Sequence, residues 1–515
     1  MCAGRGVMSV RNRAARRRRD APAAVVGAGP NGLAAAVTLA RAGVPVTVFE
    51  AAETIGGGTR TAELVSPGVL HDVCSAIHPL ALATGFFRAF ELERRVAFAV
   101  PDASYANPLD AGAGPASRDG RAAVAYRDLD RTVAELGRDG AAYARFYAPL
   151  LSRHEGVVDF ALGGSMLRWP ADLGAAAAMG LRTLEQGTRA WNLRFREAAA
   201  PALISGVAAH SIGRMPNPAT AAVGVVLGAL GHVRGWPVPL GGSRAITDAL
   251  AADLLAHGGR IETGHAVERI EELDRFGVVL FDTSARGLAE LAGSRLPPRY
   301  RRALQRFRYG DAATKVDFVL DGPVPWRDPR VHDAPTVHLG GSRAEGAAAE
   351  LAVARGRHPE RPYVLLAQPT RWDPERNPGG EHAIWSYTHV PAGSSVDLGE
   401  RVTAQIERFA PGFRDRIRAV RVTTAAELAR YNRNYHGGDF SAGRVSLPQL
   451  LARPVLSRDP WRTPLGGVYL CSSSTPPGPG VHGLSGWYAA RSALRHEYGL
   501  AAPELGLGAG QVTER

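Results

Sequence analysis

The chain is poor in the residues and patterns that mark several large classes of protein. Its three cysteines, Cys2, Cys74 and Cys471, lie far apart and form no CxxC pair. This spacing argues against a disulfide framework and against dithiol oxidoreductases, and it favours a reducing, cytoplasmic compartment. No spacing of His, Cys, Asp or Glu fits a metal site. The apolar run 219–230 is shorter than the roughly 18 residues of a membrane-spanning helix, so we expect a buried helix there.

The net positive charge is also small outside the N-terminus. The formal net charge is +12, but seven arginines against Asp20 place +6 of it within residues 1–20. The rest of the chain is only mildly basic, so we expect no nucleic-acid partner. We predict that 1–20 is a disordered Arg-rich tail and that 506–515 is a flexible tail.

Lysine is almost absent from the sequence. Lys315 is the single lysine, and the other 60 basic residues are arginine. A guanidinium group cannot replace an amine where a compact, deprotonatable donor must hold one water molecule. Lys315 is therefore a candidate catalytic residue, with an accidental surface lysine as the alternative.

The most informative pattern that is present lies between Ala23 and Glu50. It predicts a short apolar strand, the sequence Gly27-x-Gly29-x-x-Gly32, an alanine-rich helix and a second strand. Gly27 allows a tight turn, and Gly29 lets a pyrophosphate approach the backbone. Gly32 lets the helix pack closely on the strand.

The start of that helix and the end of the second strand complete a predicted dinucleotide site. The helix begins near Pro30 and Asn31, where its N-terminus offers N–H donors and positive dipole to phosphates. Glu50 ends the second strand, where a carboxylate can accept hydrogen bonds from ribose hydroxyls.

The organisation of the chain suggests one discontinuous domain interrupted twice by another. We assign 21–100, 239–307 and 455–505 to a dinucleotide-binding domain, because they contain strand, glycine-loop and helix patterns. The intervening segments 101–238, mostly helical by pattern, and 308–454, with strand-like runs, form the second domain.

A second glycine motif, Ile55-Gly-Gly-Gly-Thr-Arg-Thr61, follows five residues after Glu50. With the first motif it resembles the FAD-dependent family of phytoene desaturases, carotenoid isomerases and amine oxidases. The phytoene-dehydrogenase-related branch, often called pyridine-nucleotide-disulfide-oxidoreductase-domain proteins, is the most similar. The resemblance implies an α/β fold with a discontinuous Rossmann-type FAD-binding domain, an inserted α+β substrate domain and FAD as the cofactor.

The resemblance also implies roles for residues of the second motif and of the middle of the chain. Backbone amides around Gly56, Gly57 and Thr59 would face the FAD pyrophosphate, and Arg60 would lie near the flavin. Val267 would meet the adenine through its backbone.

The C-terminal stretch from Tyr469 to Gly483 resembles the flavin-end loop of the family. Ser473 lies where many relatives carry an acid for a ribityl hydroxyl, and Gly480, Val481 and His482 should touch the flavin ring. A helix starting here would stabilise negative charge on the reduced flavin. His482 is thereby a second catalytic candidate.

Lys315 resembles the lysine that holds a water against flavin N5 in amine oxidases. His71, Asp72, Ser75 and His78 form a further polar cluster where the family's chain passes the flavin. His210 has no motif context.

The predicted function is desaturation, dehydrogenation or isomerisation of a small apolar, unsaturated substrate, such as a polyene, by hydride transfer to flavin N5. We expect no second dinucleotide site for NAD(P)H, so the electron acceptor is oxygen, a quinone or a protein. Peripheral membrane contact is a further expectation. The alternatives are a flavin amine oxidase, disfavoured because Val481 replaces an aromatic of the family's cage, and a non-catalytic FAD-bound partner protein.

Overall fold

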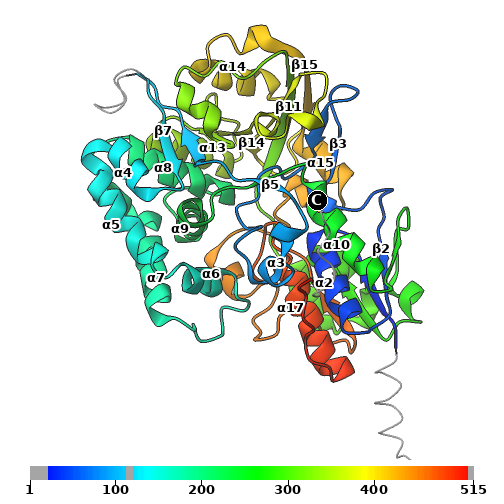
Figure 1. Cartoon of the computed structure of the whole chain (residues 1–515). Helices are drawn as coiled ribbons and strands as arrows, with labels where there is room; N and C mark the ends of the chain where they lie inside the picture. Colours follow the sequence, from blue (N-terminus) through cyan, green and yellow to red (C-terminus); the bar gives the residue numbers. More distant parts are fainter. Residues whose placement is uncertain (1–20, 112–119, 508–515) are drawn as a thin grey trace, which may run out of the picture.

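The structure, a computed structural model, describes residues 21–111 and 120–507, so the predicted tail at 1–20 and most of that at 506–515 lie outside it. A five-stranded parallel sheet contains the first glycine motif, in the strand order β16-β10-β1-β2-β9 (Figure 1). Its strands are β1 (Ala23–Val26), β2 (Val46–Phe49), β9 (Arg260–Glu262), β10 (Val278–Phe281) and β16 (Val468–Leu470).

Helices cover both faces of this sheet. Ala23 and Val25 of β1 pack on one side, and Ala24 and Val26 pack on the other, as the two-residue period of a strand requires. One face carries α2 (Pro30–Arg41), α10 (Arg244–Ala256) and α17 (Leu484–Ala493); the other carries α11 (Ala285–Leu291) and α12 (Pro298–Gln305). A parallel sheet covered on both faces is the Rossmann-type arrangement, which confirms the predicted fold class.

A second, mixed sheet has seven strands in the order β15-β11-β14-β13-β12-β6-β7. Val316, Phe318 and Leu320 of β11 point to a core shared with α14 (Gly399–Phe409), while Lys315 lies on the opposite face. The strands are β6 (Ala103–Asn107), β7 (Ala123–Tyr126), β11 (Ala312–Leu320), β12 (Thr336–Leu339), β13 (Val364–Ala367), β14 (His382–Val390) and β15 (Ile417–Thr423).

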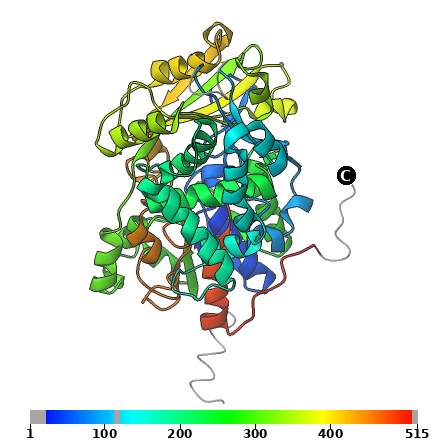
Figure 2. The same cartoon turned by 90° about the vertical axis from the view of Figure 1, so that its left-hand side faces the viewer.

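The segment predicted to be mostly helical is only partly so. β6 and β7 come from it and extend the second sheet, because β6 pairs in parallel with β12 through Tyr105 and Ala106. The rest forms a helical group that faces the viewer in Figure 2. It contains α4 (Leu129–Glu135), α5 (Gly140–Leu151), α6 (His154–Leu162), α7 (Leu173–Gly187), α8 (Ala199–Ala208) and α9 (Pro218–Val233).

The apolar run 219–230 forms most of α9, whose inward side is buried against α8. Within residues 21–111 and 120–507, no helix has both the length and the apolar character needed to cross a membrane. The domain limits given above stay predictions.

Candidate functional site

A cavity of about 1000 Å³ joins the five-stranded sheet to the second sheet. Its first end lies at the carboxyl edge of the parallel strands, where Val26, Glu50, Asp282 and Ser472 follow or end β1, β2, β10 and β16. Open α/β sheets bind ligands at this edge. Eleven of the predicted site residues line the cavity: Gly27, Gly29, Pro30, Asn31, Glu50, Gly57, Arg60, Val267, Ser473, Gly480 and Val481.

The two glycine loops pack directly against each other. The Gly56 N–H donates to the Ala28 carbonyl at 2.9 Å, and a Cβ on Gly57 would lie 3.1 Å from the Gly29 Cα. Gly32 does not line the cavity, and a Cβ there would lie 2.1 Å from the Gly27 carbonyl oxygen. Glycine is needed at these contacts because backbone meets backbone.

Gly56 and Thr59, which also lie outside the cavity lining, hold the second loop in shape. Gly56 has a φ of +114°, which favours glycine, and the Thr59 hydroxyl donates to the Gly56 carbonyl at 2.8 Å. These two residues therefore stabilise the turn that places Gly57 on the cavity.

Glu50 connects both loops at the end of β2. One carboxylate oxygen accepts from the Ala28 N–H at 2.8 Å, and the other accepts from the Ala52 N–H at 3.0 Å. Arg60 donates to that second oxygen at 3.2 Å and to the Tyr431 hydroxyl at 3.1 Å. The carboxylate is thus fixed beside the glycine loops, with lone pairs left for a ligand.

Asp282, which the sequence analysis missed, lies at the start of α2. Its carboxyl accepts from the Gly32 N–H at 2.8 Å and lines the cavity. Burial, with a smaller effect of the nearby Glu50 charge, raises its pKa well above the usual range. It is a protonatable group beside the N-terminus where a phosphate is expected.

The loop after β16 places Ser473, Gly480 and Val481 on the cavity, but it places His482 behind them. The sequence pattern predicts a helix from about Val481, but α17 begins three residues later, at Leu484. The Leu484 N–H donates to His482 Nδ1 at 3.0 Å, so the proton is on Nε2, which donates to the Gly478 carbonyl at 3.0 Å.

The structure therefore corrects the catalytic assignment of His482. Both ring nitrogens hold the loop and the start of α17, and the side chain is fully buried. Burial lowers the pKa of His482 to about 4, which keeps the ring neutral. This residue positions the loop and does not reach the cavity.

Lys315 is buried rather than exposed, which excludes the accidental surface lysine. Its ammonium forms an ion pair with Asp317, two residues along the same face of β11, and lies 5.8 Å from the centroid of the Trp385 ring. Trp385 lines the cavity and Lys315 does not. In this position the Lys315 side chain does not reach the cavity, so it does not make the predicted contact with a flavin through one water.

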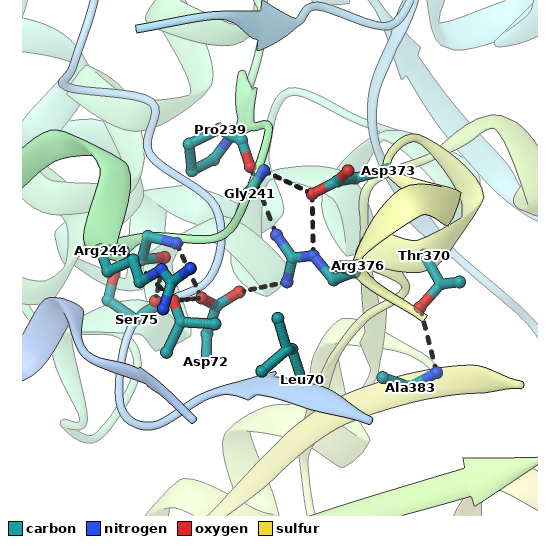
Figure 3. A network of polar contacts seen from close by, with 12 residues as sticks. Leu70, Asp72, Ser75, Pro239, Gly241, Arg244, Thr370, Asp373, Arg376 and Ala383 are labelled. Carbon is teal, nitrogen blue, oxygen red and sulfur yellow. Dashed lines mark hydrogen bonds and ion pairs between the residues drawn. The ribbon is translucent and has the colours of Figure 1, made fainter. Parts of the chain in front are cut away.

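Two buried arginines were also missed. Arg453 lies beneath the C-terminal loop, where its Nε donates to the Ser473 carbonyl at 2.8 Å, and burial lowers its pKa to about 10. Arg376 forms ion pairs with Asp72 and Asp373, both at 2.9 Å (Figure 3). No motif surrounds either arginine in the sequence.

The Arg376 network gives a structural role to Asp72, a member of the predicted polar cluster. Asp72 accepts from the Ser243 N–H at 2.8 Å, and Asp373 accepts from the Gly241 N–H at 2.7 Å (Figure 3). Arg376 is thereby held between the end of β4 (Leu70–Asp72) and the loop before α10. Of the predicted polar cluster, Ser75 and His78 line the cavity, whereas His71 and Asp72 do not.

The far end of the cavity is mostly apolar. Helices supply Leu162, Met179 and Val226, and the second sheet supplies Trp385 and Tyr387. The Trp385 and Tyr387 rings meet edge to face, with centroids 5.2 Å apart and planes at 85°. No group of three or more His, Cys, Asp or Glu among the described residues has the arrangement of a metal site.

Comparisons with known proteins agree with this architecture. Residues 25–89 match the family of the NAD(P)-binding Rossmann-like domain. The chain is 27% identical to pyridine nucleotide-disulfide oxidoreductase domain-containing protein 2 of Rattus norvegicus over 558 aligned positions, covering 92% of this chain and 93% of the relative.

Two solved structures share the fold. A variant of putrescine oxidase has a TM-score of 0.57 and 16% identity, over 92% of this chain and 99% of its own. Cyclohexylamine oxidase from Brevibacterium oxydans has a TM-score of 0.55 and 14% identity, with the same coverage. The domain match and the rat relative agree with a dinucleotide-binding oxidoreductase, and the two solved structures share its fold.

Proposed function

We propose that the chain is an FAD-dependent oxidoreductase that dehydrogenates, desaturates or isomerises an apolar, unsaturated, polyene-like substrate. The observation that carries this proposal is one continuous cavity that runs from the glycine loops to an apolar end. A site of this kind places a dinucleotide and a second, apolar molecule next to each other.

The residues at the first end fit FAD. A Cβ on Gly29 would lie 2.8 Å from Asp282 Oδ2, so only glycine leaves this cradle open to a phosphate. Asn31 Oδ1 is buried without a hydrogen-bond partner among the described residues, and Asn31 lines the cavity. We propose that Gly29, Gly57, Glu50 and Val267 hold the cofactor, with Asp282 protonated so that it does not repel the phosphates.

When bound, FAD would supply a hydride acceptor for a substrate carbon. The chain orients the substrate and excludes water with the apolar walls of α6, α7 and α9. As the final electron acceptor we propose oxygen, a quinone or a protein. The role of Lys315 at N5 remains a proposal that would require its ammonium to leave Asp317.

The amine oxidase alternative has less support from the geometry, although the two solved structures named above are called amine oxidases. Trp385 and Tyr387 contact each other edge to face, so they leave no gap for an amine between them. A non-catalytic FAD protein has no need of an apolar chamber that meets the glycine loops. Both alternatives stay outcomes of the test.

The visible spectrum of the purified protein under anaerobic conditions tests the proposal. Bound FAD that bleaches with polyenes supports it, and bleaching with amines supports the amine oxidase alternative. FAD that stays oxidised with every compound supports the non-catalytic protein. Failure to bind FAD after reconstitution would contradict the assignment of the glycine loops as a dinucleotide-binding site.

We also propose peripheral membrane contact through the outer side of α7. Leu173, Leu181 and Leu184 are 58–66% exposed along one stripe of this helix, and Trp169 in the preceding loop is 87% exposed. The inner side of the same helix lines the cavity through Met179. Co-sedimentation with phosphatidylcholine–phosphatidylserine vesicles should fall when Trp169 and Leu173 are both changed to Ser.

A further inference from the structure

His210 brings a free ring nitrogen to the apolar end of the cavity. His210 follows α8 and lines the cavity, and its ring lies 5.3 Å from that of Trp236, measured between centroids. Its Nε2 is hydrogen-bonded to His338 Nε2 at 2.9 Å. Nδ1 has no hydrogen bond to any described residue, and it is not among the fully enclosed polar atoms. It is therefore accessible from the cavity.

A chain of three side chains sets which proton His210 carries. The Asn107 side-chain oxygen accepts from His338 Nδ1 at 3.2 Å. His338 Nε2 is then unprotonated and accepts from His210 Nε2, which leaves His210 Nδ1 as a lone-pair acceptor. Burial lowers the pKa of His210 to about 3, so the ring stays neutral.

Two hydroxyl groups beside His210 are also without partners. Ser211 Oγ and Thr336 Oγ1 have no hydrogen bond to any described residue, and both residues are more than nine-tenths buried and line the cavity. Thr336 and His338 lie two residues apart on the same face of β12. Buried polar groups in native proteins are nearly always paired. Both oxygens are enclosed in this structure, so each meets a ligand in the cavity only when its side chain turns about χ1.

This end of the cavity has no charge to match a charged ligand. The charged side chains that line the cavity belong to the glycine-loop end or to the segment 430–433, which the Arg433–Glu268 ion pair at 2.9 Å ties to that end. Lys315 and Asp317 neutralise each other beneath Trp385. A buried ammonium or carboxylate needs a partner of opposite charge, and none is present among the described residues.

We propose that His210, with Ser211 and Thr336, forms a polar subsite for a hydroxyl group at one end of an otherwise apolar substrate. The hydroxyl donates to His210 Nδ1, and it accepts from Ser211 or Thr336 once that side chain has turned toward the cavity. The apolar part lies along α7 and α9, toward the glycine loops. This inference rests on the proposed function, because it specifies the substrate class of the same cavity.

The test compares ligands that share one chain and differ at the end group. Oleyl alcohol, oleyl methyl ether, oleyl aldehyde and oleylamine are titrated into the FAD-loaded protein, and binding is followed by tryptophan fluorescence, since Trp236 and Trp385 line the cavity. We expect the alcohol to bind about tenfold more tightly than the ether, as for one buried hydrogen bond. An alcohol–ether difference below twofold, or tighter binding of the aldehyde or amine, overturns the proposal.

Variants separate the subsite from general damage. His210→Phe should remove the alcohol–ether difference in affinity, while its affinity for the ether stays within twofold of that of the original chain. The control His358→Phe, at a residue outside the cavity, should keep the alcohol–ether difference. Thr336→Val has nearly the same shape and serves as the second variant if His210→Phe does not fold; it should lower the preference at least threefold. An unchanged preference in Thr336→Val and His210→Phe contradicts the assignment.

The outcome for the subsite is distinguishable from that for the proposed function. Bleaching of FAD by polyenes together with equal binding of alcohol and ether would reject the subsite and keep the oxidoreductase. Binding of none of the four ligands, with no bleaching by polyenes, would reject both.

Discussion

Replacing Lys315 with Met should destabilise the protein mainly by leaving Asp317 alone. Asp317 is fully buried, its Oδ1 is paired with Lys315, and its Oδ2 has no partner among the described residues. Removing one member of a buried ion pair costs about 3–5 kcal/mol, because the remaining charge is desolvated. We expect a loss of this size in the free energy of unfolding at pH 8.

The pH dependence of that loss follows from the carboxyl. Burial already raises the pKa of Asp317, and Lys315 opposes this effect. Without the lysine the folded pKa rises further, so the folded state takes up a proton that the unfolded state does not hold. The stability is therefore lost as pH rises through the raised pKa, and the cost of Lys315→Met should be smaller at pH 5.5 than at pH 8.

Urea unfolding followed by tryptophan fluorescence measures these values. The matched variant is Lys315→Met with Asp317→Leu, which replaces the pair by apolar side chains and should recover stability to within about 1 kcal/mol of the original chain. A loss below about 1 kcal/mol for Lys315→Met at pH 8, or a double variant no more stable than the single one, refutes the reasoning. Unchanged rates of flavin reduction and reoxidation in the double variant would leave Lys315 a structural role only.

Three further variants test other parts of the structure. Gly486→Ala places a Cβ 1.8 Å from the Asn31 carbonyl oxygen, so α17 must move away from α2. We expect the free energy of unfolding to fall by about 1–3 kcal/mol and FAD to bind more weakly in a fluorescence titration. The control Gly466→Ala, whose Cβ meets open space, should change neither value. Arg376→Met should cost about 3–5 kcal/mol in urea unfolding, against at most about 1 kcal/mol for the half-exposed Arg371→Met. Because burial raises the pKa of Asp282, the stability that this carboxyl contributes is lost as pH rises. The melting temperature of Asp282→Asn, relative to that of the original chain, should therefore increase from pH 5 to pH 8. A difference that stays constant over this range would contradict the prediction.

The sequence predicts the first glycine loop and its strands well because their signals are local. Gly27, Gly29 and Gly32 lie within six residues, and each performs a turn or a close contact that only glycine permits. Asp282 could not be predicted in the same way, since it meets Gly32 across 250 residues of sequence. A contact of this kind depends on the order of strands in the sheet.

The buried arginines show a different limit. With 60 arginines in the chain, nothing in the sequence distinguishes Arg376 or Arg453, which are buried, from the many that lie on the surface. The single lysine was conspicuous for the opposite reason, and the structure confirms only that it is buried. For His482 the motif predicted the right loop, but the hydrogen bonds of both ring nitrogens depend on where α17 begins.

The same pair of charges limits what Lys315 can do in catalysis. To hold a water in the cavity, its ammonium would have to leave Asp317 and pass Trp385. The buried carboxylate left behind would then be unpaired, at a cost of about 3–5 kcal/mol. This cost is small only if Asp317 is protonated at the same time. A catalytic Lys315 therefore requires its activity to fall as pH rises through the pKa of Asp317, whereas a structural Lys315 leaves the reaction rate independent of that carboxyl.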